Sequence, residues 1–172
     1  RFSNYITQDC YKDFELYGAQ RASGLVMSES GTRNIAVTAG VFYCAQNRQS
    51  TSSIDTSTGD TFEIWNSSAS TSPDSSGVSQ VDNQQYWNGA ALVNLTNNRY
   101  GTRFFYLDYD GSLHMQYGTS NAVDVADALN ETVPTPPTFL ADFAIYIGRV
   151  VIEEDGTTFN AVTNPFTSPE EG

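Results

Sequence analysis

The clearest pattern in the sequence is a pair of aromatic and apolar runs within residues 103–118, on either side of Asp110-Gly111. An Asp-Gly pair between two strand-like runs favours a β-hairpin with a two-residue type I′ turn, because both turn residues need a positive φ. That turn predicts a register in which Tyr106 lies opposite Met115. The same register places Asp108 near the solvated tip. We therefore expect a Lys to be tolerated at Asp108 and to prevent folding at Tyr106.

The predicted hairpin is apolar on both of its faces. One face has the composition of a core and holds Phe104, Tyr106, Leu113, Met115 and Tyr117. The other face is mixed, yet Phe105, Leu107 and Tyr109 make it too apolar for a plain solvent-facing surface. A sheet with two apolar faces needs cover on both sides. We expect that cover to come either from a second layer of the same chain or from a neighbouring subunit.

Alternation of apolar and polar residues predicts further short strands. They lie at 34–45 with a break at Gly40, at 61–65, at 91–95 and at 144–152. The last of them is predicted to turn at Asp155-Gly156 into a partner strand at 157–162, with Ile152 opposite Phe159. The polar stretches 48–59 and 66–79 are predicted to be exposed loops, because they hold too little apolar surface to pack.

One short helix is predicted at 122–130, with Asn121 as its N-cap and Asp124 in the capping-box position. About nine residues are too few for a stable isolated helix, so we expect it to dock on the sheet. These elements together indicate a mostly β fold, an antiparallel sandwich or barrel-like domain with one short helix. The expected parts are an arm or linker to an upstream shaft at 1–33, a β-rich domain at 34–163 and a tail at 164–172.

The charge of the chain argues against two classes of partner. The formal net charge is −12, from 20 acidic and 8 basic residues, and the basic residues form no cluster. A nucleic-acid-binding surface needs a basic patch, so we expect no nucleic-acid partner. No apolar run approaches the ~18 residues of a membrane span, so we expect no membrane insertion. The absence of an initiator Met and of a signal peptide favours a fragment of a longer protein or a processed product.

The sequence carries no recognisable catalytic motif. His114 is the only histidine and no G-x-S-x-G elbow is present, so a packed or surface histidine is favoured over a catalytic base. One His and two distant Cys do not supply a zinc site, and we expect neither a metal nor a cofactor. Acidic residues are plentiful, so a carboxylate pair of a glycan depolymerase stays open. Cys10 and Cys44 form either a disulfide or two buried thiols, and the low Cys content favours the thiols.

The candidate ligand-binding residues are aromatic side chains expected on loops and turns, namely Trp65, Tyr86, Trp87, Tyr100 and Tyr109. A flat aromatic ring can stack on the apolar face of a sugar, while Asn, Asp and Gln side chains bind the sugar hydroxyls. Tyr and Trp are also general anchors of protein interfaces. The alternative interpretation is that most of these residues lie in the core or in a subunit interface.

The run from Gln85 to Val151 resembles the C-terminal, distal region of bacteriophage tail-fibre and related virion receptor-binding proteins. The matching pieces are QYWNGAALVNLTNNRYGTRFFYLDYDGSLHMQYG, a short helix with Ala126 and Ala128, the Pro-rich VPTPPTFL, and IYIGRVVIEEDGTT. Upstream, NIAVTAGVFYC and TFEIW fit the same layout. The resemblance covers residues 34–163 and consists of pattern and segment order, without a catalytic signature.

This resemblance implies a β-rich homotrimer on a virion, outside the cell, in contact with other virion proteins. Its function would be to attach a fibre or spike to a host surface polysaccharide or protein, without catalysis. Phe105, Leu107 and Tyr109 would then pack across the three-fold interface. Two alternatives stay open: a monomeric carbohydrate-binding module of a secreted protein, and a capsid decoration or spike-base protein. The long Ser/Thr stretch at 66–79 and the acidity depart from the pattern and leave the ligand open.

Overall fold

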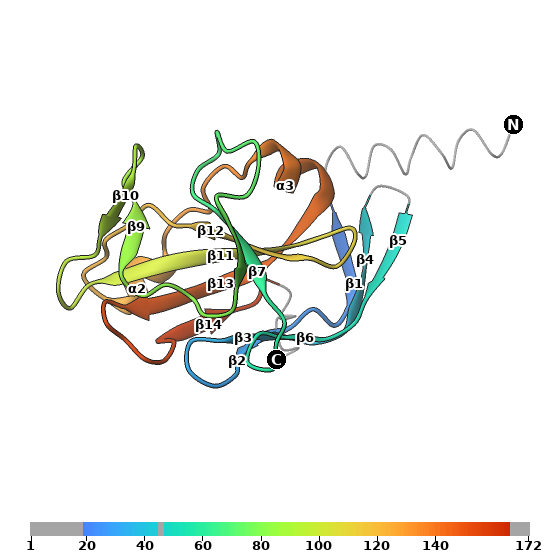
Figure 1. Cartoon of the computed structure of the whole chain (residues 1–172), viewed down its shortest axis with the longest axis horizontal. Coiled ribbons are helices and arrows are strands. Elements are labelled where there is room, and N and C mark those ends of the chain that lie inside the picture. The colour runs from blue at the N-terminus through green and yellow to red at the C-terminus, as the bar shows by residue number, and fades with distance from the viewer. Residues whose placement is uncertain (1–18, 45–46, 166–172) are drawn as a thin grey trace, which may run out of the picture.

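The computed structural model describes residues 19–44 and 47–165 (Figure 1). This part of the chain is mostly β-structure, arranged as several sheets with two short helices and no closed barrel. The mostly β fold is therefore confirmed, whereas the expectation of one helix was one too few. Residues 1–18 of the expected arm, with Cys10, and residues 166–172 of the expected tail lie outside the described residues.

A six-stranded sheet organises the domain. Its strands, in order across the sheet, are β14 (Ala161–Thr163), β13 (Ala144–Glu153), β11 (Tyr100–Asp108), β12 (Leu113–Tyr117), β7 (Phe62–Trp65) and β8 (Ser75–Val78). Neighbouring strands are antiparallel except β12 and β7, which are parallel. Both β11 and β13 are buried at most positions, which explains their nearly continuous apolar sequences. The strands predicted at 61–65 and 144–152 are confirmed.

Three smaller sheets surround the central one (Figure 1). They are β1 (Gln20–Ser23) with β4 (Gly40–Cys44) and β5 (Asn47–Thr51); β2 (Met27–Glu29) with β3 (Ile35–Val37) and β6 (Ile54–Asp55); and β9 (Gln85–Trp87) with β10 (Leu92–Asn94). The strand predicted at 34–45 is interrupted as expected, but at residues 38–39 rather than at Gly40, which is the first residue of β4. The strand predicted at 91–95 is β10.

Several segments expected to be irregular form strands instead. The stretch 48–59 contributes to β5 and β6, and 66–79 contains β8. Their side chains are mostly polar and exposed, so these strands are held by backbone pairing and show no apolar pattern. Residues 19–33 belong to the domain rather than to an arm, because Leu25 and Met27 are buried in its core.

Both apolar faces of the central hairpin are covered by this chain. On one face the core joins Leu25, Met27, Ile35, Val37 and Phe42 to Phe62, Phe105, Leu107, Leu113 and Met115. On the other face Trp65, Phe104 and Tyr106 pack against Leu140 of α3 (Thr138–Phe143), and Val151 packs against Ala128 of α2 (Val125–Leu129). Phe105 and Leu107, which were expected at a subunit interface, have exposed fractions of 0% within the single chain.

The register of the central hairpin differs from the prediction by one residue. Tyr106 lies opposite His114, and Met115 lies opposite Phe105. The Asp108 N–H donates to the Ser112 carbonyl over 3.1 Å, so the loop has three residues rather than two. Its last residue is a glycine with φ +91°, as in a three-residue hairpin loop closed by a bulge. A shift of one residue exchanges the two faces of a strand.

The second hairpin shows a similar shift. Val151, rather than Val150, lies opposite Ala161, and Phe159 precedes the paired residues. The side-chain oxygen of Asn160 accepts the N–H of Glu153 over 2.9 Å and so replaces a backbone pair. The loop is therefore longer than the two-residue turn that the Asp-Gly pair predicts.

A bulge at Gly148 exchanges the faces of β13. Phe105 pairs with Gly148, and Tyr106 pairs with Tyr146, so one residue of β13 has no partner. Gly148 has φ +148°, and a Cβ on it would lie 2.2 Å from the carbonyl oxygen of Thr163. The bulge places Ile147 and Val150, three residues apart, in the same core.

The helix predicted at 122–130 exists but is shorter, and a different residue caps it. The Asp124 side chain accepts the N–H of Asp127 over 2.8 Å and begins α2, whereas the Asn121 side chain contacts Thr96. The second helix, α3, follows Pro137 in a segment for which no element was predicted from the sequence. Its apolar side chains cover the face of the central sheet that carries Trp65, Phe104 and Tyr106.

Arg103 is buried and binds the segment that leads into β9. Its guanidinium donates to the carbonyl oxygens of Asp82 (2.9 Å and 3.2 Å), Gln85 (2.5 Å) and Thr102 (3.0 Å). It also lies 3.5 Å from the Asp82 carboxylate and 4.8 Å from the ring centre of Tyr117. The guanidinium therefore fixes residues 82–85 to the central sheet.

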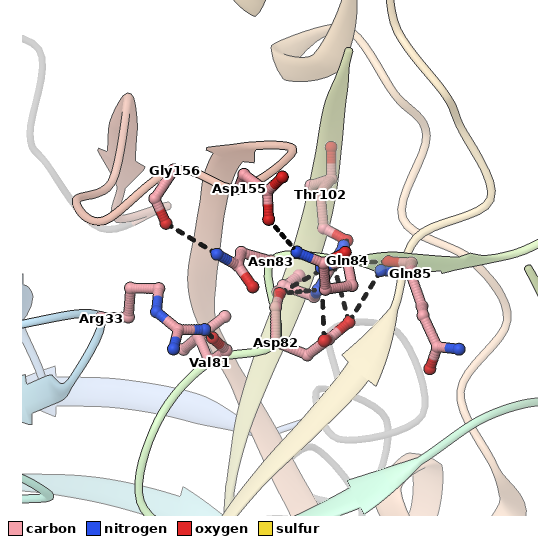
Figure 2. Close-up of polar contacts among 10 residues, drawn as sticks. Arg33, Val81, Asp82, Asn83, Gln84, Gln85, Thr102, Asp155 and Gly156 are labelled. Atoms are coloured by element: carbon pink, nitrogen blue, oxygen red, sulfur yellow. Dashed lines mark hydrogen bonds and ion pairs between the residues drawn. The ribbon is translucent and has the colours of Figure 1, made fainter. Parts of the chain in front are cut away.

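The same segment is held from its other side (Figure 2). The Asn83 amide donates to the carbonyl oxygen of Gly156 over 2.9 Å, and the Gln84 amide contacts the carboxylate of Asp155. Arg33 donates to the carbonyl oxygen of Val81 over 2.7 Å. Contacts from both sides therefore hold residues 82–85 in place, although all four of their side chains are polar.

Candidate functional site

The only histidine of the chain is buried in a polar network. His114 is 2% exposed, and its Nε2 lies 3.1 Å from Oδ2 of Asp108. The indole N–H of Trp65 donates to His114 Nδ1 over 3.2 Å. Because an indole N–H only donates, this bond makes Nδ1 an acceptor and leaves Nε2 to carry the proton toward Asp108. The Glu63 carboxylate lies 3.2 Å from Nδ1 at the edge of the network.

Asp108 organises the tip of the hairpin. Its Oδ1 accepts the N–H groups of Asp110 (3.1 Å) and Ser112 (2.9 Å), while its Oδ2 meets His114. Burial raises the pKa of Asp108, but the hydrogen bonds from His114 and from the turn outweigh burial and lower the pKa overall. Asp108 is 3% exposed, so the expectation that it lies at a solvated tip was wrong.

The arrangement around His114 holds no nucleophile of a catalytic triad among the described residues. The polar partners found for it among residues 19–44 and 47–165 are Asp108, Trp65 and Glu63, and none of these is a hydroxyl or thiol nucleophile. A triad needs a nucleophile within hydrogen-bond reach of the base. The network fixes the Trp65 ring and the hairpin tip relative to each other.

An open cleft lies beside this network. Its volume is about 460 Å³, and its lining residues are Cys44, Asn47, Gln49, Tyr109, Phe139, Asp142 and Phe143. The walls come from β4 and β5, from the tip of the β11–β12 hairpin and from α3. Three parts of the chain that are distant in sequence therefore meet at this place, namely the β4–β5 hairpin, the β11–β12 tip and α3.

The aromatic wall of the cleft is both exposed and well supported. Tyr109 is 49% exposed and Phe143 is 46% exposed. Their ring centres are 5.9 Å apart at 67°, and Phe143 lies 5.5 Å from Phe139. Phe139 in turn stacks on the buried Trp65 at 5.8 Å and 9°. The exposed rings thus rest on a fixed aromatic base rather than on mobile side chains.

The polar groups of the cleft are amides and one carboxylate. Asn47 and Gln49 stand two residues apart on β5, which places their side chains on one face of that strand. Asp142 is the only charged residue in the lining. Burial, and then the negative charge of Asp108, raise the pKa of the Cys44 thiol. The thiol of Cys44 is free.

A second, smaller cleft is built around Trp87. It has a volume of about 250 Å³ and is lined by Asn66, Ser67, Ser68, Trp87, Gly89, Gln116, Tyr117, Thr119, Pro134 and Thr135. Trp87 is half-buried and packs against the main core. The ring of Tyr117 already carries the guanidinium of Arg103 on one face. This cleft therefore offers less open aromatic surface than the first.

The five aromatic residues proposed from sequence are not brought together. Trp65 is 2% exposed and lies in the core, so its placement on an exposed loop was wrong. Tyr86, Trp87 and Tyr100 are half-buried and belong to other parts of the surface. Only Tyr109 lines the main cleft.

Sequence reasoning missed the residues of α3 that complete the cleft. Phe139, Asp142 and Phe143 follow a Pro-rich segment in a helix of only six residues. Such a helix is too short to show a reliable period. The usable signal was the pair of Phe residues four apart, which share one side of a helix.

Comparisons with known proteins add no assignment: no protein-family model, no curated protein and no solved structure matches this chain. In the part of the chain that the structure describes, no helix is long and apolar enough to cross a membrane. Within the same ranges, no group of three or more His, Cys, Asp or Glu residues is arranged to hold a metal ion.

Proposed function

We propose that this chain is a fibre or spike domain of a virion that attaches the particle to the host cell surface, without catalysis. The observation that carries the proposal is the cleft between α3 and the β11–β12 tip, where Tyr109 and Phe143 expose their rings beside amide side chains. Fixed, exposed aromatic rings flanked by hydrogen-bonding groups are typical of recognition sites. Weak binding by each copy would be compensated by avidity in a trimer and across several fibres.

The composition of the cleft supports binding rather than turnover. A glycosidase needs two carboxyl groups facing each other across about 5–10 Å. Asp142 is the only carboxylate among the residues that line this cleft. His114, the one histidine, is buried behind Phe139 with its ring nitrogens engaged. A depolymerase would therefore need residues other than these.

A direct test is attachment to cells. The fluorescently labelled chain is incubated with a panel of bacterial strains, and binding is measured with and without excess unlabelled chain. We expect saturable binding to a subset of strains and its loss in the Phe143→Ala variant. Uniform weak binding to every strain, or none at all, would contradict the proposal.

A second candidate is a monomeric carbohydrate-binding module, and one observation favours it. Both faces of the central hairpin are covered by this chain, and of the three residues expected at a three-fold interface only Tyr109 is exposed. Light scattering separates the two candidates. A mass of three times 18.8 kDa supports the fibre domain, and a mass of 18.8 kDa supports the module.

A further inference from the structure

We propose that the cleft binds an uncharged oligosaccharide, with Tyr109 and Phe143 as stacking surfaces and with Asn47, Gln49 and Asp142 as ligands for hydroxyl groups. The inference rests on the proposed function, because it assigns a class of ligand to the same cleft. The expected ligand of the cleft is a sugar rather than a protein receptor. The inference also excludes acidic sugars, which many cell-surface polysaccharides contain.

The aromatic rings provide surfaces on which sugar rings can stack. One face of a pyranose presents mainly C–H groups, and these pack well on the electron-rich face of an aromatic ring. Tyr109 and Phe143 meet at 67°, so they offer two walls rather than one flat platform. Phe139, which stacks on the buried Trp65, supports Phe143 from behind. Rings that are already ordered lose little conformational entropy when a ligand binds.

The polar groups match the hydroxyl groups of a sugar. Each hydroxyl donates one hydrogen bond and accepts others, and an amide side chain does both. Asn47 and Gln49 of β5 lie on the same face of the β4–β5 ladder as Cys44 of β4, because Asn47 pairs with Cys44 and Gln49 pairs with Phe42. Asp142 adds an acceptor on the opposite wall. A purely apolar ligand would leave these groups without partners.

Charge decides which class of sugar fits. Asp142 is the only ionised side chain in the lining, and neither Lys nor Arg lines the cleft. The negative charge of Asp108 adds to burial in raising the pKa of the Cys44 thiol on the β4 wall. The whole chain carries a formal charge of −12. A uronate, sulfate or sialic acid group would be repelled, whereas neutral hexoses would not.

The test uses isothermal titration of the purified chain with four uncharged hexasaccharides, built from glucose, galactose, mannose or N-acetylglucosamine, and with hexagalacturonate as the acidic probe. We expect at least one uncharged hexasaccharide to bind and the acidic one to bind at least about tenfold more weakly. Tyr109→Ala and Phe143→Ala should each weaken binding about tenfold. The matched control is Tyr43→Ala, because Tyr43 is 42% exposed but lies outside the cleft lining.

A second measurement needs no variant of the cleft. Cys44 lines the cleft, so a bound hexasaccharide should slow its alkylation by iodoacetamide, as followed by mass spectrometry of the Cys44 peptide. Protection of Cys44 at saturating hexasaccharide supports the inference even where a variant fails to fold. Binding without protection would place the sugar elsewhere and overturn it.

The outcomes separate this inference from the proposed function. Failure of all four uncharged sugars to bind, or equal or tighter binding of hexagalacturonate, overturns the inference. Attachment to cells without any sugar binding also overturns it and leaves the proposed function in place, with a protein receptor as the ligand. Sugar binding without attachment to any cell supports the inference and counts against the proposed function.

Discussion

Phe139 stacks on Trp65 with the ring planes 9° apart, and this contact joins the exposed cleft to the buried polar network. Trp65 is held from the other side by His114 Nδ1, and His114 is held by Asp108. The chain of contacts runs from the turn at the hairpin tip to the wall of the cleft. Changes inside this network should therefore affect both the stability of the domain and the geometry of the cleft.

Replacement of His114 by Ala should destabilise the domain by about 3 kcal/mol. The change leaves the Trp65 indole N–H and Oδ2 of the buried Asp108 carboxylate each without a partner, and an unsatisfied buried group costs about 1–3 kcal/mol. Urea denaturation followed by circular dichroism measures the loss. Glu63→Gln serves as the control, because the Glu63 side chain is 37% exposed and should contribute less than about 1 kcal/mol. A similar cost for both variants would show that the network does not support the fold.

Asp108 should make the stability of the domain depend on pH in the acid range. Its pKa in the folded state is lowered, so its contribution is fully present above its ordinary pKa of 3.8 and is lost as the pH falls through the folded-state value. Asp108→Asn should reduce this acid dependence and lower the stability at neutral pH. Urea midpoints between about pH 2 and pH 7 test this. An unchanged acid profile in Asp108→Asn would assign the dependence to other carboxylates.

The corrected register reverses the prediction for a Lys at the hairpin tip. Asp108→Lys should now prevent folding or destabilise the domain severely, because it buries an unpaired ammonium against His114 Nε2 and removes the acceptors of the turn. Asp110→Lys, at an exposed position of the same loop, should be tolerated within about 1 kcal/mol. Soluble expression and thermal melting distinguish the two variants. If Asp108→Lys is tolerated, the result would contradict the three-residue loop and support the two-residue turn.

Gly148→Ala should be among the most damaging single changes. The added Cβ would meet the Thr163 carbonyl oxygen at 2.2 Å on a backbone with φ +148°, so β13 would have to shift away from β14. We expect a loss above about 4 kcal/mol or no folded protein. Gly77→Ala is the matched control, because Gly77 also has a positive φ but open space around it, and should cost about 1–2 kcal/mol. Equal thermal melting shifts would show that backbone strain, rather than the clash, dominates at Gly148.

Arg103→Lys should destabilise the domain although it keeps the charge. A lysine ammonium cannot reproduce the planar set of donors that reaches the carbonyl oxygens of Asp82 and Gln85, and it would leave some of them unpaired. The expected loss is about 3 kcal/mol. Arg48→Lys, on the exposed surface of β5, should change the urea midpoint very little. Equal effects would mean that packing against Tyr117, rather than hydrogen bonding, explains the burial of Arg103.

Local sequence signals were enough to locate much of the fold. The apolar strands, the interruption just before Gly40, the two hairpins and the first helix follow from period and turn residues that are visible along the chain. The register of both hairpins did not follow, because Asp-Gly is compatible with a two-residue turn and with longer loops. Side-chain hydrogen bonds determine the loop length, and with it the register: those of Asp108 in one loop and of Asn160 in the other.

The cleft shows most clearly what only the tertiary structure decided. The sequence by itself determined that the chain is acidic, mostly β and rich in exposed polar segments, and it marked Tyr109 as a candidate. It did not determine that Phe143 lies beside Tyr109 or that Trp65 lies beneath Phe139. Burial and proximity arise from long-range packing between segments whose local patterns are independent of one another. For that reason the cleft follows only from the placement of the sheet, α3 and the β4–β5 hairpin together.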